Sequence, residues 1–134
     1  MTQARDIYGN VFARGCVTLL ARIVGNDANV LTGAAVSSVK YTIFLLDTND
    51  PGKGIPVRGY RDVDISPEKI VFDELQTEDP RWDVDDQGYN FRHTLMNDNG
   101  KIFTAVNRHY LVEYRLTPRG GNAVVTLRFR LFVI

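Results

Sequence analysis

Two histidines are the first residues of this chain whose chemistry could serve catalysis. His93 falls on the same parity as Phe91 and Leu95 in an alternating run, which predicts an inward-facing, hydrogen-bonded side chain. His109 stands at the entrance of the next apolar run and is predicted at the surface or at a strand edge. Neither histidine has the spacing to a second histidine or a cysteine that a metal site requires. With no nucleophile motif or phosphate-binding loop either, the sequence predicts no catalytic residue and a protein that is not an enzyme.

An acidic run at residues 83–88 could bind a cation. Asp83-Val84-Asp85-Asp86-Gln87-Gly88 matches the opening of a calcium loop, with carboxylates at positions 1 and 3, an oxygen side chain at position 5 and glycine at position 6. Position 12 is Thr94, where such a loop needs a bidentate glutamate, so an EF-hand is excluded. A weaker calcium site on Asp83, Asp85 and Asp86 stays open beside the simpler interpretation of a solvated turn. No other cofactor is expected.

Aromatic side chains near loops could instead bind a sugar, because an aromatic face stacks on the apolar face of a pyranose. Trp82, Tyr60 and Tyr8 all stand in or next to predicted loops. Their spacing is not that of a binding platform, and Trp82 is more simply explained as a plug beneath the acidic loop. Trp82 is nevertheless the ligand candidate of an alternative hypothesis, a carbohydrate- or calcium-assisted adhesion module with a glycan as partner.

The composition narrows the classes of protein and partner. The chain has 134 residues, enough for one domain, and 16 basic residues balance 16 acidic ones. A zero net charge gives no field to draw it to nucleic acid or to an anionic bilayer. No signal-peptide profile opens the chain and no apolar run approaches ~20 residues, so we expect neither export nor a membrane span. The single cysteine, Cys16, is predicted to be a buried core residue.

The elements that must position these residues are strands. Alternating apolar residues predict strands at 17–24, 39–46, from 55 or 57 to 65, and at 88–95, 110–116 and 124–134. A turn at 66–68 is predicted to feed a short strand at 70–72. Residues 1–11 are polar and aperiodic and are predicted to be an N-terminal arm. The prediction is therefore an all-β fold, a single antiparallel sandwich of about seven strands spanning 12–134.

Some of these strands are apolar on both parities, which a sandwich with one solvated face does not need. The two-sided stretches are Leu19-Leu20, Ile43 to Leu46 and, at the end, Leu131 to Ile134. Either loops or a neighbouring subunit must cover the second face, and we favour a subunit and a homo-oligomer. The predicted interface residues are Leu131, Phe132, Val133, Ile134, Phe44 and Leu46.

Two short phrases resemble known domains. Asp85-Asp86-Gln87-Gly88-Tyr89-Asn90-Phe91 resembles the opening of a late strand in immunoglobulin-like domains, whose tyrosine packs at a corner of the sandwich. Phe91 stands where antibody domains have their second cysteine, so the resemblance is to the disulfide-free Ig-like class. Val30-Leu31-Thr32-Gly33-Ala34-Ala35-Val36 resembles a phrase of small Ig-like domains in tailed-phage virion proteins.

This second resemblance implies a structural role without catalytic residues. Such domains decorate capsids, tails or baseplates, bind neighbouring virion proteins and in some cases host-surface glycans. The expected function is therefore that of a non-enzymatic virion or assembly protein, located in the virion and in the cytoplasm before assembly. The arm at residues 1–11 and the C-terminal strand are then expected to contact other subunits.

Overall fold

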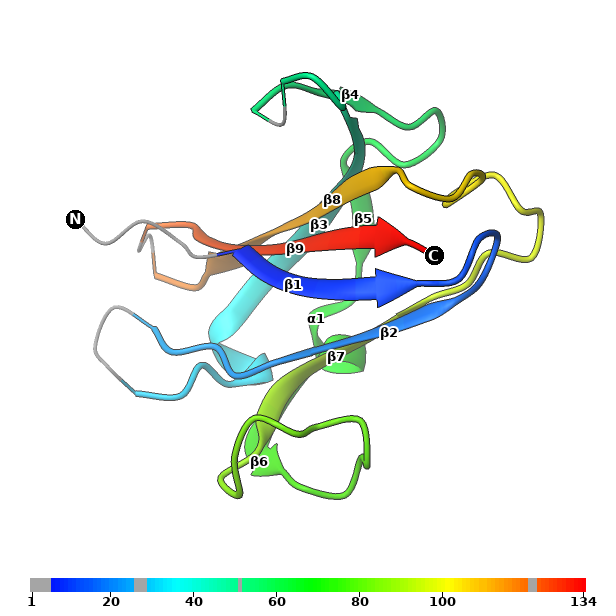
Figure 1. The fold of residues 1–134 in the computed structure, drawn as a ribbon. Coiled ribbons are helices and arrows are strands. Elements are labelled where there is room, and N and C mark those ends of the chain that lie inside the picture. Colours follow the sequence, from blue (N-terminus) through cyan, green and yellow to red (C-terminus); the bar gives the residue numbers. More distant parts are fainter. Residues whose placement is uncertain (1–5, 26–28, 51, 121–122) are drawn as a thin grey trace.

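The computed structural model describes residues 6–25, 29–50, 52–120 and 123–134, which form nine strands and two short helical turns (Figure 1). The strands are β1 (Asp6–Val11), β2 (Val17–Ala21), β3 (Val36–Leu46), β4 (Gly54–Pro56), β5 (Val63–Ile65), β6 (Val71–Gln76), β7 (Tyr89–Leu95), β8 (His109–Pro118) and β9 (Val125–Val133). The helical turns are the 3-10 turn η1 (Gly33–Ala35) and the single-turn helix α1 (Pro67–Ile70).

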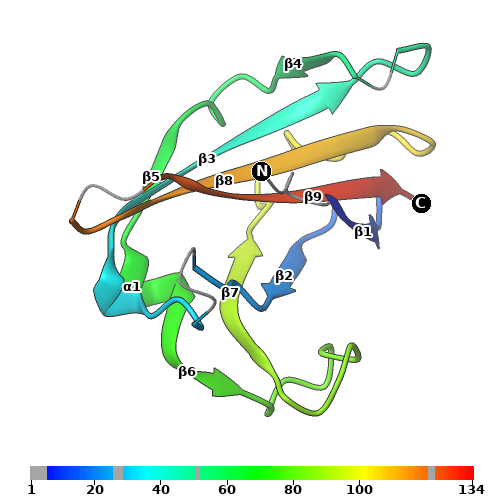
Figure 2. The same cartoon turned by 90° about the vertical axis from the view of Figure 1, so that its left-hand side faces the viewer.

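The strands form two sheets that pack face to face as a sandwich (Figure 2). The larger sheet has the order β1-β9-β8-β3-β4, with β5 also paired to β3, and the smaller sheet has the order β2-β7-β6. The predicted all-β sandwich is confirmed. Its strands are antiparallel except for one pair, since β1 runs parallel to β9.

The core lies between the sheets and is rich in aromatic rings. Phe91 of β7 meets Tyr114 of β8 edge to face at 4.8 Å between ring centroids, and Phe129 of β9 lies 5.9 Å from the same tyrosine. Leu19 and Ala21 of β2 are also buried, as their parity predicts. Hydrophobic burial of this kind provides the main stabilisation of a sandwich.

Six of the described strands are divided between the two sheets as in an Ig-like sandwich, whereas β1 pairs with β9 in the larger sheet. Such a fold places strands B, E and D in one sheet and C, F and G in the other. With β2 as B and β3 as C, β7 and β6 correspond to E and D, and β8 and β9 to F and G. The corner tyrosine of Ig-like domains opens strand F, whereas Tyr89 opens β7 in the smaller sheet. The corner that the resemblance implies at Tyr89 therefore stays a prediction.

Residues 6–11 differ from the arm that the sequence predicts. They form β1, an integral strand of the larger sheet, paired residue by residue with β9. Ile7, Gly9 and Val11 share the inward side of β1. Because Gly9 has no side chain, the apolar residues of that side are four positions apart and the two-residue period is not visible in the sequence. Residues 1–5 of the predicted arm lie outside the described part of the chain.

Three further local predictions are corrected. Cys16 is exposed rather than buried: it precedes β2, and its Sγ accepts a hydrogen bond from the Asn97 N–H at 3.4 Å. The strand predicted at 55–65 is split into β4 and β5, because the chain turns at Gly59, whose φ is +87°. Residues 66–68, predicted as a turn, begin the helix α1 with Pro67 at its start, and the short predicted strand follows it as β6.

Candidate functional site

The best candidate for a functional surface is the face of the larger sheet that points away from the smaller one, called here the outer face. Side chains alternate along a strand, so the neighbours of the core residues Leu131, Val112 and Ile43 lie on this face. The strand register places Phe44 opposite Leu111, Leu111 opposite Arg130, and Arg130 opposite Tyr8. Phe132 lies between Asn10 and His109 in the next row.

Apolar side chains dominate one end of the outer face. Phe44 and Phe132 are half-buried, Leu111 between them is 6% exposed, and Tyr8 is 75% exposed. The His109 ring packs against the Phe132 ring, with 4.8 Å between ring centroids. Phe12 and Ile134 extend apolar surface beyond the ends of β1 and β9. The group Tyr8, Phe44, Leu111 and Phe132 is called the outer apolar patch below.

Charged side chains beside the outer apolar patch neutralise one another. Asp6 pairs with Arg130 at 3.0 Å and with Arg128 at 3.3 Å, and Arg128 also lies 3.9 Å from Glu113. All four belong to adjacent strands of the outer face. Because each charge has an opposite partner, this region carries little net field and does not oppose the approach of a neutral surface.

The six predicted interface residues lie partly in the core and partly on the outer face. Leu131 and Val133 point into the core and are 2% and 0% exposed, so they are not available to another subunit. Phe44 and Phe132 lie on the outer face, and Ile134 is 47% exposed at the end of β9. Leu46 shares the face of Phe44 but is buried, with Gly54 packed against it.

The acidic run is held by bonds within the chain. Asp85 pairs with Arg22 at 2.7 Å and accepts hydrogen bonds from Trp82 Nε1 at 3.3 Å and from the backbone N–H groups of Gln87 and Gly88 at 3.0 and 3.1 Å. Asp83 and Asp86, the other two residues of the calcium candidate, are exposed. No three His, Cys, Asp or Glu side chains of the described residues gather as metal ligands would.

Two of the three aromatic residues of the carbohydrate hypothesis, Tyr8 and Trp82, line one groove between β1, β2 and the loop at residues 77–88. Trp82 is half-buried in the loop between β6 and β7 and packs on Tyr89, with 5.8 Å between ring centroids. Tyr8 projects on the outer face, opposite Arg130. Tyr60 lies in the turn after β4, where its C=O accepts a hydrogen bond from the Ile43 N–H. Tyr60 therefore lies apart from the groove that Tyr8 and Trp82 share, and glycan binding stays a prediction.

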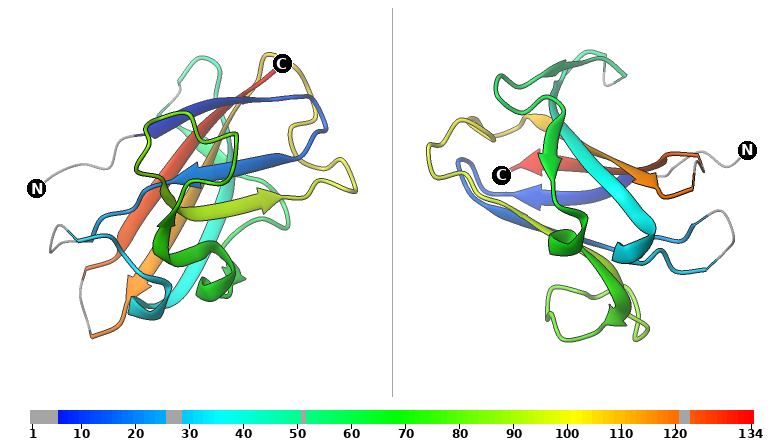
Figure 3. Two further views of the ribbon diagram at one scale, coloured as in Figure 1. Left: turned by 90° about the horizontal axis from the view of Figure 1, so that it is seen from below. Right: turned by 180° about the vertical axis from the view of Figure 1, so that it is seen from behind.

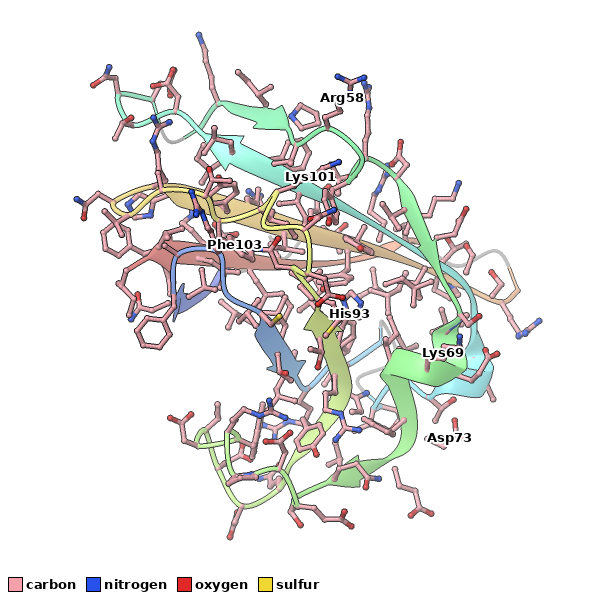
Figure 4. The ribbon with its side chains drawn as sticks, turned by 90° about the vertical axis from the view of Figure 1, so that its right-hand side faces the viewer. Arg58, Lys69, Asp73, His93, Lys101 and Phe103 are labelled. Carbon is pink, nitrogen blue, oxygen red and sulfur yellow. The ribbon has the colours of Figure 1, made fainter. Side chains whose placement is uncertain are left out.

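His93 is an inward-facing residue, as its parity predicts. It lies near the end of β7, toward the space between the sheets (Figure 4), and its Nδ1 is 2.6 Å from the Tyr114 hydroxyl. The Tyr41 ring lies 5.2 Å away. Burial lowers the pKa of His93 to about 4, from an ordinary value of 6.5. The ring is therefore neutral at physiological pH and supports the core rather than a proton-transfer site.

This burial predicts a loss of stability in mild acid. Below pH 6.5 the unfolded chain binds a proton on His93 that the folded chain accepts only near pH 4. The free energy of unfolding should thus fall as the pH drops from 6.5 to 4, by up to about 3 kcal/mol. Denaturant titrations at several pH values would measure it. In His93→Gln this part of the pH dependence should be absent, and an unchanged dependence would contradict the assignment.

A buried carboxylate that the sequence did not reveal fixes the loop at residues 77–88. Asp79 is buried and accepts two hydrogen bonds from the Arg81 guanidinium, at 2.8 and 2.6 Å. Hydrogen bonds from the Arg81 side chain lower the pKa of Asp79 to about 2. Arg81 also donates to the Thr18 hydroxyl at 2.8 Å and so attaches the loop to β2. The sequence feature that could have indicated this ion pair is the short spacing between Asp79 and Arg81.

A buried amide was missed as well. Asn90 of β7 is fully buried, although its parity predicts an outward position. Its Oδ1 accepts from the Ile23 N–H at 2.6 Å, and its Nδ2 donates to the carbonyl oxygens of Ile23 and Leu31 at 3.0 and 2.6 Å. The Asn90 side chain therefore supplies the hydrogen bonds that a neighbouring strand would otherwise give to the backbone at Ile23 and Leu31.

Comparison with known proteins gives no relative. No family model matches the chain, and neither the curated proteins nor the solved structures contain a match. None of the helices in the described residues is long and apolar enough to cross a membrane.

Proposed function

We propose that this chain is a non-enzymatic assembly protein and that its outer face packs against a neighbouring subunit of a larger particle. The resemblance of residues 30–36 to small domains of tailed-phage virion proteins favours a virion, such as a capsid, tail or baseplate, as that particle.

The observation that carries the proposal is the outer apolar patch. A sandwich needs apolar residues only between its sheets, yet Phe44 and Leu111 lie opposite each other on the outer face and Phe132 lies in the next row. Apolar surface on such a face marks sites of protein association. Aromatic side chains are enriched at the centres of protein interfaces, where they contribute most of the binding energy.

A charge in the centre of the patch should prevent assembly. Expressed together with the products of its neighbouring genes, the wild-type chain is expected to sediment with assembled particles on a density gradient. Phe132→Glu should reduce the particle-bound fraction about tenfold or more, because a carboxylate would be buried without a partner.

Thr126→Glu is the matched control. Thr126 lies on the same strand and the same face as Phe132, opposite Arg115 and away from the patch, so this variant should sediment like the wild type. Circular dichroism would verify that both variants fold. Equal particle binding by all three proteins would contradict the proposal, as would a wild-type chain that never enters particles.

A further inference from the structure

We propose that two copies of this chain pair through β1, edge to edge, so that their larger sheets join into one continuous sheet. Among the described strands, β1 is the last one of the larger sheet and has β9 as its one neighbour (Figure 2). The inference rests on the proposed assembly function and names a second copy of this chain as one partner in the assembly. It uses a sheet edge rather than the outer apolar patch, so the two can be tested separately.

β1 uses only half of its backbone hydrogen-bonding groups within the chain. The Val11 C=O accepts from the Ile134 N–H at 2.8 Å, which shows that Val11 turns its backbone groups toward β9. Successive residues of a strand turn these groups to opposite sides, so Ile7 and Gly9 also face β9. Tyr8 and Asn10 then direct their N–H and C=O groups outward, away from the sheet, and both residues are exposed.

Other edges of the two sheets carry the features that prevent pairing with another chain. β6 exposes two acidic side chains, Asp73 and Glu74, that would repel a second copy. β4 and β5 have only three residues each, and β4 ends in Pro56. Short strands, charges and proline are the usual protections of a sheet edge.

The edge of β2 is protected by the loop at residues 77–88, which lies in front of it when the molecule is seen from below (Figure 3, left). Two contacts attach the loop: Arg81 to the Thr18 hydroxyl at 2.8 Å, and Asp85 to Arg22 at 2.7 Å. A covering loop removes an edge strand from pairing as effectively as a charge does.

β1 is protected neither by charge nor by proline; the loop residues Arg81 to Val84 line a groove beside it, and Ile7 to Asn10 stay exposed there. Its four exposed residues, Ile7 to Asn10, include neither a charged side chain nor proline. The one charge of the strand, Asp6, is already neutralised by Arg128 and Arg130. An exposed edge of this length without charge or proline is a template for another strand.

A second copy fits this edge because identical strands pair antiparallel about a two-fold axis. Each copy then presents the free donors and acceptors of Tyr8 and Asn10 to the same groups of its partner. Repulsion is also small, because the chain has 16 basic and 16 acidic residues and a net charge of zero.

Proline at position 10 tests this pairing. Asn10→Pro removes an N–H that points outward and that β9 does not use, and proline is tolerated at such edge positions. Asn10→Ala, the matched control, keeps the N–H. Sedimentation equilibrium should give dimers for the wild type and for Asn10→Ala. For Asn10→Pro the dissociation constant should rise about tenfold or more, since each dimer loses two hydrogen bonds and gains two steric clashes.

Hydrogen exchange gives an independent readout that needs no variant. The Tyr8 and Asn10 amides should be protected at high protein concentration and exchange rapidly after dilution. A wild-type monomer, a dimer unaffected by Asn10→Pro, or exchange of these amides that does not depend on concentration would each overturn the inference. A dimer lost in Phe132→Glu and kept in Asn10→Pro would also overturn it, while supporting the outer face as the contact.

Discussion

Gly88→Ala is expected to lower the free energy of unfolding by about 3–5 kcal/mol. Gly88 has a φ of +107°, a conformation that side chains strongly disfavour. A Cβ at this position would lie 2.2 Å from the Gln76 carbonyl oxygen, which is backbone and cannot rotate away. The loop at residues 77–88 and the start of β7 would both have to shift. Urea denaturation followed by tryptophan fluorescence would measure the loss, with Trp82 in that loop as the reporter.

Gly59→Ala is the control that separates the cost of a positive φ from the cost of a steric clash with the Gln76 carbonyl oxygen. Gly59 also has a positive φ, +87°, but a Cβ there would have no heavy atom within 4 Å. Its substitution should therefore cost only the conformational strain, about 1–2 kcal/mol. Equal losses for the two variants would show that the contact with Gln76 does not matter.

Asn90→Ala should destabilise the fold by a comparable amount, about 3–4 kcal/mol. The substitution leaves a donor on Ile23 and acceptors on Ile23 and Leu31 without partners in a buried position. It also leaves a cavity, because Asn90 is fully buried. The same denaturation measurement applies.

Asn99→Ala is the matched control for that change. Asn99 is exposed, and its side chain accepts one hydrogen bond, from the Lys101 N–H at 3.2 Å. We expect a loss below about 1 kcal/mol. If Asn90→Ala were as mild as Asn99→Ala, the role assigned to the buried amide would be wrong.

Strands whose inward positions hold large apolar residues could be predicted from the sequence. Leu19 and Ala21 in β2 and the alternation through β8 and β9 give a clear two-residue period, and the structure follows it. β1 was not predicted, because Gly9 interrupts its inward side and its partner β9 is distant in sequence. No local pattern reports a pairing between the two ends of a chain.

The candidate surface could be predicted only in part. Apolar residues on both parities correctly placed Phe44 and Phe132 on a second face, but the same pattern included Leu131 and Val133, which belong to the core. Residue type alone does not distinguish the two faces of a strand. Asp79 was not predicted to be buried, because its burial depends on the fold of the loop around Arg81.

The central claim is that the outer face of the larger sheet contacts a neighbouring subunit in an assembled particle. A cryo-electron microscopy structure of such particles tests it most directly. We predict atoms of another chain within about 4 Å of Phe44 and Phe132, the distance of apolar packing. Particles that contain the chain with this face open to solvent in every copy would contradict the claim.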